Sequence, residues 1–274
     1  MPSMISIAQK TQSFRDLHKR ERGFIIPNPW DAGSARLLEE LGFEALATTS
    51  AGAAFSMGVA DGAISREAVL DNARAICAAV SVPVNGDLLN GFGDAPETVA
   101  ETIRLAAEAG LAGGSIEDTT GDPARPLYEL DHAVERVQAA VEAARALPQP
   151  FVLTARCDGL LARACTVEEA VRRVLAYQAA GADVLYVPAL TDLDQVRALL
   201  AAVERPVNVL AGPGQLRDAN ALLDAGVQRV SVGSSLYTAV MGAFMRAAET
   251  LKTGQMSYTE GALPYIELQK RFTK

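Results

Sequence analysis

Hydrophobic and polar positions along this chain form two sequence patterns that alternate. In the first, a helical stretch closes on small residues and Gly before an apolar strand, as in "ELGFEALATTS", "EAGLAGGSIED", "AAGADVLYVPA" and "DAGVQRVSVGS". The glycine suits a helix C-terminus, where a left-handed residue satisfies the last carbonyls. The second phrase places Pro before or at a strand start, as in "VPVNGD", "LPQPFVLTAR" and "RPVNVLAG". Stretches with an apolar period of 3.6, such as "PETVAETIRLAAEAG", predict helices between the strands.

The pattern predicts eight short apolar strands, near 24–27, 45–49, 83–87, 113–117, 151–155, 183–187, 207–210 and 229–232, each followed by a helix. Strands that are apolar at nearly every position are typical of sheets covered on both faces. We therefore predict an α/β fold, a single (β/α)8 TIM-type barrel over residues 1–274, with a doubly wound open sheet as the alternative. A helix at about 7–20 is expected to plug the lower end of the barrel. A helical tail at about 255–274 is expected to pack on a neighbouring subunit.

Composition is consistent with this fold and excludes several classes of partner and location. The 274 residues are 49% hydrophobic and 21% charged, and the net charge is −8. With no basic stripe, neither nucleic acid nor an anionic membrane surface is an expected partner. No run of 18 apolar residues predicts a membrane span, and the first 20 residues lack the apolar segment of a secretory signal. Three cysteines without metal or disulfide spacing complete the picture of a reduced, cytoplasmic protein.

The ends of the predicted strands carry the candidate chemistry. In a TIM-type barrel the C-terminal strand ends form the active site, and here they bring acids together at Asp61, Asp87 and Glu117. Carboxylates in one cavity repel each other unless a cation neutralises them, and Mg²⁺ typically takes one or two carboxylates, waters and substrate oxygens. Arg156, at the end of the fifth strand, can grip a substrate carboxylate through two parallel hydrogen bonds. The residues thus predict Mg²⁺-assisted binding of a small carboxylate.

Simpler interpretations remain open for several of these residues. Asp31 and Asp94 each precede a predicted helix and can act as N-caps. Asp118 can simply accept hydrogen bonds from loop N–H groups, and Arg156 can form a structural ion pair with Asp158 or Glu117. No lysine occurs between Arg20 and Leu251, which excludes Schiff-base chemistry within the barrel.

Taken together, "NPWDAGSARLLEELGFEALATTSAG", "GDLLNGFGD", "SIEDTTGD" and "TARCDGLL" resemble the isocitrate lyase / phosphoenolpyruvate mutase superfamily. The similarity runs from about Phe14 to Leu251 and looks closest to the phosphoenolpyruvate phosphonomutase-like branch. It implies a barrel that exchanges its eighth helix with a partner in a homodimer or homotetramer. It also implies Mg²⁺ and an α-oxo acid or its enolate as ligand.

The resemblance also implies roles for individual residues. Asp87 and Glu117 match the acids that organise the metal, Asp61 matches an aspartate of the loop after strand 2, and Arg156 matches the strand 5 arginine. The substrate oxyanion is expected at the backbone N–H groups of Ser50, Ala51 and Gly52.

Two departures from the family pattern are visible. Leu89 stands where the family usually has a second acid on strand 3. The loop "TTGDPARPLYEL" lacks the Lys and Cys of the "K[KR]CGH" gating loop of the lyases, and the Lys and Asn that phosphonomutase needs.

We therefore predict a carbon–carbon lyase of this superfamily that acts on a small 2-oxo or 2-hydroxy acid through an enolate, as in oxaloacetate-type decarboxylation. Retro-aldol cleavage needs a base, for which Tyr186, Asp118 or a metal-bound hydroxide is available. Trp30 and Asn208, also at strand ends, are expected to contact the substrate. The alternatives are C–P chemistry, as a phosphonomutase or phosphonopyruvate hydrolase, and a non-catalytic carboxylate-binding relative.

Overall fold

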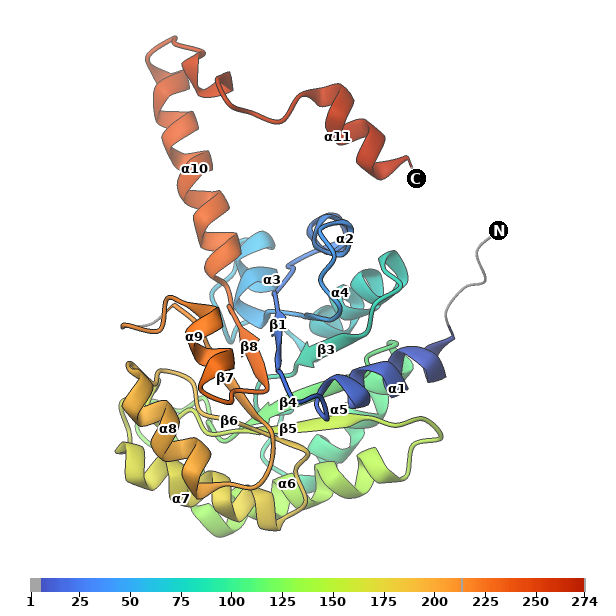
Figure 1. Cartoon of the computed structure of the whole chain (residues 1–274), viewed down its shortest axis with the longest axis vertical. Helices are drawn as coiled ribbons and strands as arrows, with labels where there is room; N and C mark the ends of the chain where they lie inside the picture. Colours follow the sequence, from blue (N-terminus) through green and yellow to red (C-terminus); the bar gives the residue numbers. More distant parts are fainter. Residues whose placement is uncertain (1–5, 213, 274) are drawn as a thin grey trace.

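Eight parallel strands surrounded by helices form a nearly closed barrel in the computed structural model, which describes residues 6–212 and 214–273 (Figure 1). Residues 1–5, 213 and 274 of the predicted 1–274 domain lie outside the described residues. The strands pair in the order β1-β8-β7-β6-β5-β4-β3-β2, and the Ala47 N–H, which donates to Pro27 O at 3.0 Å, links β2 to the end of β1. The predicted (β/α)8 barrel is confirmed. The strands are β1 (Phe24–Ile26), β2 (Leu46–Ala47), β3 (Val84–Asp87), β4 (Gly113–Glu117), β5 (Val152–Arg156), β6 (Val184–Tyr186), β7 (Val207–Leu210) and β8 (Arg229–Ser231).

A helix follows each strand, as the sequence predicts, and β2 is followed by two. A further helix precedes β1, and another lies in the C-terminal tail. The helices are α1 (Ile7–Leu17), α2 (Ala32–Glu40), α3 (Ser50–Ser56), α4 (Arg66–Ala79), α5 (Pro96–Glu108), α6 (Leu130–Arg145), α7 (Val167–Ala179), α8 (Leu193–Ala202), α9 (Ala219–Asp224), α10 (Ser235–Lys252) and α11 (Tyr265–Phe272), with a 3₁₀ turn at Ser257–Thr259. Asp31 caps α2, because its Oδ1 accepts the Ser34 N–H at 2.7 Å. Asp94 does not cap α5, whose N-cap is Ala95, and the expected cap at Asp94 is wrong.

The N-terminal helix closes the lower end of the barrel, as the sequence predicts. Phe14 and Leu17 of α1 are buried in a cluster with Phe24 and other residues at the strand starts. Gly113 makes room for this plug: a Cβ there would lie 2.9 Å from Phe14 Cε1 and 2.5 Å from Val152 O. The helix ends at Leu17, three residues earlier than expected.

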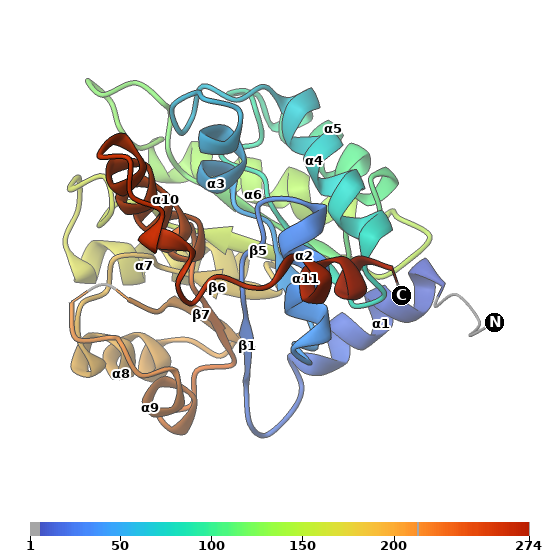
Figure 2. The same ribbon diagram turned by 90° about the horizontal axis from the view of Figure 1, so that it is seen from above.

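The C-terminal helices leave the barrel. Figure 1 shows α10 projecting away from the strands, and within α10 only Tyr237 is buried. Large apolar side chains stand exposed along it, at Val240, Phe244, Met245 and Leu251. Seen from above, α11 returns over α2 (Figure 2), where Arg271 lies 3.2 Å from Glu40. The exchange of α10, the eighth barrel helix, with a partner subunit stays a prediction, and so does the packing of the tail on a neighbouring subunit. No helix in the described part of the chain is long and apolar enough to span a membrane.

His18 follows α1 and is buried at the base of the barrel. Its Nδ1 lies 2.8 Å from Phe14 O and its Nε2 lies 3.5 Å from Arg229 Nη1. Burial, and then the positive charge of Arg229, lower the pKa of His18 from 6.5 to about 3. The imidazole is therefore neutral in the folded protein at every pH above that value.

This buried histidine predicts acid sensitivity. Between pH 6.5 and about 3, His18 is protonated in the unfolded chain but not in the folded chain. The unfolding free energy is therefore at its full value above pH 6.5 and falls as the pH drops through this window. His18→Gln should flatten the pH dependence of the unfolding free energy there by up to about 1.4 kcal/mol per pH unit. Urea denaturation at pH 7, 5.5 and 4.5 measures this, with the half-buried His132→Gln as control. Equal slopes in His18→Gln and wild type would contradict the assignment.

Candidate active site

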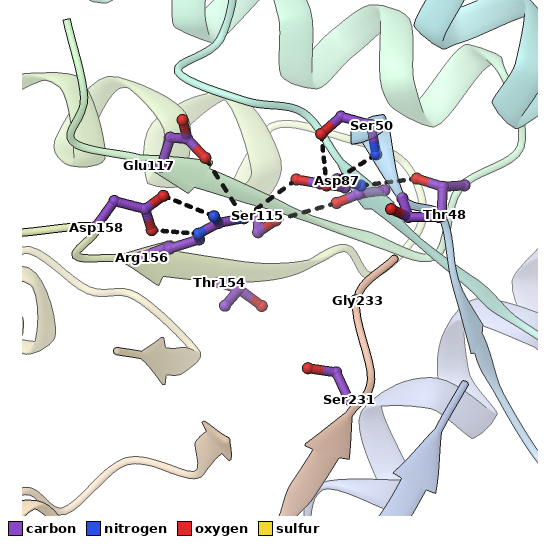
Figure 3. A network of polar contacts seen from close by, with 12 residues as sticks. Thr48, Ser50, Asp87, Ser115, Glu117, Thr154, Arg156, Asp158, Ser231 and Gly233 are labelled. Atoms are coloured by element: carbon purple, nitrogen blue, oxygen red, sulfur yellow. Dashed lines mark hydrogen bonds and ion pairs between the residues drawn. The ribbon is translucent and has the colours of Figure 1, made fainter. Parts of the chain in front are cut away.

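Two acids from adjacent strands meet at one arginine in the mouth of the barrel. Asp87 ends β3, Glu117 ends β4 and Arg156 ends β5. The Nη1 atom of Arg156 lies 3.5 Å from Asp87 Oδ1 and 3.4 Å from Glu117 Oε2 (Figure 3). The sequence assigned these two acids to one metal site, and both carboxylates do face one common atom. Their role as metal ligands stays a prediction.

Arg156 is held from its other side by Asp158. Its Nε and Nη2 donate to the two carboxylate oxygens of Asp158, the Nη2 bond being 2.6 Å long. The Nε–Nη2 edge of the guanidinium already forms two parallel hydrogen bonds with Asp158, so this edge is not available to a substrate carboxylate. Only the Nη1 side faces Asp87 and Glu117, so Arg156 is both a structural ion pair and a cation turned toward the mouth.

Residues at the end of β2 orient Asp87. Its Oδ2 accepts hydrogen bonds from the backbone N–H and the hydroxyl of Ser50, both at 2.9 Å. Its own N–H donates to Thr48 Oγ1 at 2.8 Å. The Gly52 N–H donates to the capping hydroxyl of Thr49 at 3.2 Å. Two of the three amides expected to hold an oxyanion, those of Ser50 and Gly52, thus already serve the protein.

Asp61 approaches the same group from an exposed loop. The hydroxyl of Ser50 lies 3.4 Å from Asp61 Oδ1. Partial burial of this carboxyl, and then the nearby charge of Asp87, raise the pKa of Asp61 above its ordinary value. The structure therefore places Asp61 beside the acids of the mouth, as the sequence predicts, although its part in any chemistry stays a prediction.

The carboxyl of Glu117 is buried in the mouth, and its pKa is strongly raised. Burial raises its pKa to about 8, the charges of Asp158 and Asp87 add to the shift, and Arg156 opposes it. The Thr119 hydroxyl donates to Glu117 Oε1 at 2.6 Å. A cation bound here would favour the ionised form of this carboxyl.

A buried network beneath the mouth fixes Asp158. Asp118 Oδ1 accepts the Asp158 N–H at 2.9 Å. The other oxygen of Asp118 accepts from Tyr177 Oη at 2.6 Å and from Arg173 Nη1 at 3.2 Å. Asp118 thus does more than accept loop N–H groups: it ties the Arg156–Asp158 pair to α7.

Tyr186 and Asn208 line a small inner pocket together with Asp87 and Arg156. The guanidinium of Arg156 lies 5.2 Å from the centre of the Tyr186 ring, and burial raises the pKa of Tyr186 to about 12. Asn208 is 1% exposed, its Nδ2 donates to Ser231 Oγ at 2.9 Å and its Oδ1 accepts from Arg229 Nε at 2.8 Å. Both the nitrogen and the oxygen of the Asn208 side-chain amide therefore form hydrogen bonds within the barrel.

Trp30 stands apart from this group. It is not among the residues that line the inner pocket, and its ring meets that of Tyr237 edge to face at 5.4 Å. The inner pocket is also lined by three residues that were not predicted as site residues: Thr48, Asn85 and Arg229. A signal for the last two was present, because each places a polar side chain inside an apolar strand.

The charges of the mouth do not balance. Four carboxylates surround the single guanidinium of Arg156: Asp61, Asp87, Glu117 and Asp158. Within residues 6–212 and 214–273, no group of three or more His, Cys, Asp or Glu side chains is arranged to hold a metal ion directly. A metal at this point would therefore take at most two protein ligands, Asp87 and Glu117, with water for the rest, which is a pattern that Mg²⁺ accepts.

Comparison with known proteins places this chain in a family. The phosphoenolpyruvate phosphomutase family matches residues 14–252. The chain belongs to this family. A solved structure from Burkholderia cenocepacia J2315, described in general terms as a lyase/mutase, is 53% identical with a TM-score of 0.95, covering 98% of this chain and 97% of that one. The resemblance to the isocitrate lyase / phosphoenolpyruvate mutase superfamily, and the expectation of an enzyme of that superfamily, are confirmed.

Two further relatives have named activities. The oxaloacetate decarboxylase of Paraburkholderia xenovorans is 31% identical over 253 residues, which cover 89% of this chain and 82% of that protein. A phosphonopyruvate hydrolase solved with oxalate and Mg²⁺ is 26% identical with a TM-score of 0.84, covering 96% of both chains.

The family's second strand 3 acid has a different counterpart here. Leu89 packs against the hydrophobic core between the barrel and its helices, and its backbone oxygen accepts the Glu117 N–H at 3.0 Å. Leu89 adopts a φ of 50°, an uncommon conformation for a residue with a side chain. The position therefore supports Glu117 through its backbone and supplies no carboxylate.

The loop after β4, where family lyases carry their gating motif, folds back on itself. Thr119 and Leu127 form an isolated antiparallel bridge. Beyond it, Tyr128 Oη donates to Asp94 Oδ1 at 2.6 Å, which explains why Asp94 is not a helix cap. This hydrogen bond connects the C-terminal end of the loop after β4 to the loop after β3.

The Asp118 network predicts a large structural effect. Asp118→Asn leaves an acceptor for the Asp158 N–H but removes the charge that partners buried Arg173, and we expect a loss of about 3 kcal/mol in unfolding free energy. Tyr177→Phe removes one hydroxyl and should cost about 1 kcal/mol. Urea denaturation measures both, with the exposed Asp194→Asn as control. A loss at Asp118 no larger than at Asp194 would refute the network.

Proposed function

We propose that this protein is a Mg²⁺-dependent lyase that cleaves a C–C bond of a small 2-oxo or 2-hydroxy acid through an enolate, with decarboxylation of an oxaloacetate-like acid as its reaction. The observation that carries this proposal is the meeting of Asp87 and Glu117 at Arg156 Nη1. Both are fixed by neighbouring hydroxyls, and the surrounding charge is negative. The similarity to an oxaloacetate decarboxylase and to a hydrolase solved with oxalate and Mg²⁺ supports it.

The donor set of the mouth fits a hydrated divalent cation. Asp87 and Glu117 would hold the ion, and Asp61 and Asp158 add negative potential around it. When bound, Mg²⁺ acts as a Lewis acid on the negative charge that develops on the substrate oxygen. Arg156 presents Nη1 to a substrate carboxylate, and Ser50 keeps Asp87 in place through two hydrogen bonds.

Decarboxylation suits these residues because it needs no protein base. The bond to the departing carboxylate breaks, its electron pair forms the enolate, CO₂ leaves, and a solvent proton on carbon completes the product. Retro-aldol cleavage requires a base, and both protein candidates are unsuited. Tyr186 is protonated near neutral pH, since burial raises its pKa to about 12, and Asp118 is buried and accepts three hydrogen bonds.

Oxalate binding tests the metal site. As an enolate mimic, oxalate should bind the wild type in Mg²⁺ and lose affinity about 10- to 100-fold or more in EDTA or on Asp87→Ala. Titration calorimetry measures both. Asp31→Ser is the matched control, because it removes a carboxylate but keeps a capping hydroxyl on α2. Equal oxalate affinity in Mg²⁺ and in chelator would show the metal mechanism to be wrong.

Product formation tests the reaction. Incubation with oxaloacetate and Mg²⁺ should release pyruvate, and Glu117→Gln should lower the rate by about 100-fold or more, because it removes a charge that the metal requires. Oxaloacetate also decays slowly without enzyme, so Asp87→Ala at the same Mg²⁺ concentration sets the baseline. Wild-type release no faster than this baseline would contradict the assignment.

The same assay separates the rival activities. Phosphonopyruvate in place of oxaloacetate should yield no inorganic phosphate and no phosphoenolpyruvate. Formation of either compound by the wild type, but not by Asp87→Ala, would establish C–P chemistry instead. Tight Mg²⁺-dependent oxalate binding without turnover of any tested acid would identify a carboxylate-binding protein.

A further inference from the structure

The core of this barrel is polar directly beneath the mouth. TIM-type barrels usually fill this space with layers of bulky branched residues. Here a cavity of about 50 Å³ reaches from Asp87 and Arg156 down into the barrel. Eight buried residues with polar side chains line it: Asn28, Thr48, Asn85, Ser115, Tyr186, Asn208, Arg229 and Ser231. The space is large enough for a few water molecules, and hence for one carboxylate group in their place.

Arg229 is a buried charge with only neutral partners. It is 2% exposed. Its Nε donates to Asn208 Oδ1 at 2.8 Å and its Nη2 donates to Thr154 Oγ1 at 2.9 Å. Its Nη1 lies 3.5 Å from the neutral imidazole of His18. No carboxylate of residues 6–212 and 214–273 forms an ion pair with it.

Such an arrangement is costly unless something compensates the charge. Burial without a counter-charge disfavours the guanidinium and lowers the pKa of Arg229 to about 10. A guanidinium has five N–H donors, and the contacts above involve three. In the same cavity, the buried Oδ1 of Asn85 has no hydrogen-bond partner. The floor of the pocket thus has both spare donors and an unpaired acceptor.

We propose that Arg229 is the second anion-recognition group of the substrate pocket and selects substrates that carry a second carboxylate. This inference rests on the proposed function. Arg156 and Arg229 are the two cations that line the pocket, and Arg156 already faces Asp87, Glu117 and Asp158. Arg229 therefore supplies the positive charge that an additional carboxylate requires, and a water bound to that carboxylate donates to Asn85.

A matched pair of stable 2-hydroxy acids tests this role. Malate and lactate differ by one carboxylate, and calorimetry in Mg²⁺ should show wild type binding malate at least about tenfold more tightly than lactate. Arg229→Gln should reduce this preference to nearly equal affinities, and Arg229→Lys should restore part of it. Oxalate, which is short enough to stay in the mouth, should bind Arg229→Gln nearly as well as wild type. The exposed Arg205→Gln controls for loss of one positive charge.

A second variant covers the case in which Arg229→Gln does not fold. Asn85→Asp is nearly isosteric and places a negative charge in the same cavity, so it should abolish the malate preference in a stable protein. Equal wild-type affinities for malate and lactate, or an unchanged preference in Arg229→Gln or Asn85→Asp, would overturn the proposal. If instead no Mg²⁺-dependent oxalate binding occurs in the wild type, the proposed function itself fails.

Discussion

The structure of the site depends on one guanidinium that holds several carboxylates in a partly buried space. Without Arg156, the carboxylates of Asp87, Glu117 and Asp158 would face one another at close range and repel. Asp158 takes two of the N–H groups of Arg156 and leaves Nη1 to the other two acids. One positive charge cannot neutralise all of them. The site is therefore built with a negative surplus, which makes a divalent cation a natural occupant.

Asp87 and Asp158 are each fixed by residues at the end of a neighbouring strand. Asp87 is oriented from β2, through Thr48 and Ser50. Asp158 is oriented through Asp118, which connects to Tyr177 on α7. The positions of the charges thus follow from the barrel, because strands that pair in parallel bring their C-terminal ends together. Charges held by rigid elements need little reorganisation when a ligand binds.

Some of these features could be predicted from the sequence and others could not. Strands, helices and the grouping of Asp87, Glu117 and Arg156 depend on periodicity and topology, which the sequence pattern carries. The hydrogen bonds depend on side-chain rotamers, which it does not. Capping propensity alone suggested that Asp94 caps α5. Instead, the Asp94 carboxylate accepts a hydrogen bond from the hydroxyl of Tyr128, which comes from the loop after β4. Arg229 was overlooked because chemistry was expected only at the C-terminal ends of the strands, and this residue lies at the start of β8.

Two features make the pocket less negative. Leu89 stands where the family pattern has a carboxylate, and Arg229 is a buried positive charge. With Leu89 turned into the core, the mouth has one acid fewer than the family pattern and repels an anionic substrate less. Below it, an arginine with only neutral partners adds positive potential from the floor. In a cavity that is partly screened from water both effects are stronger than they would be in bulk solvent. The proposed role of Arg229 follows from this balance: the pocket would favour a more highly charged acid than the mouth alone would select.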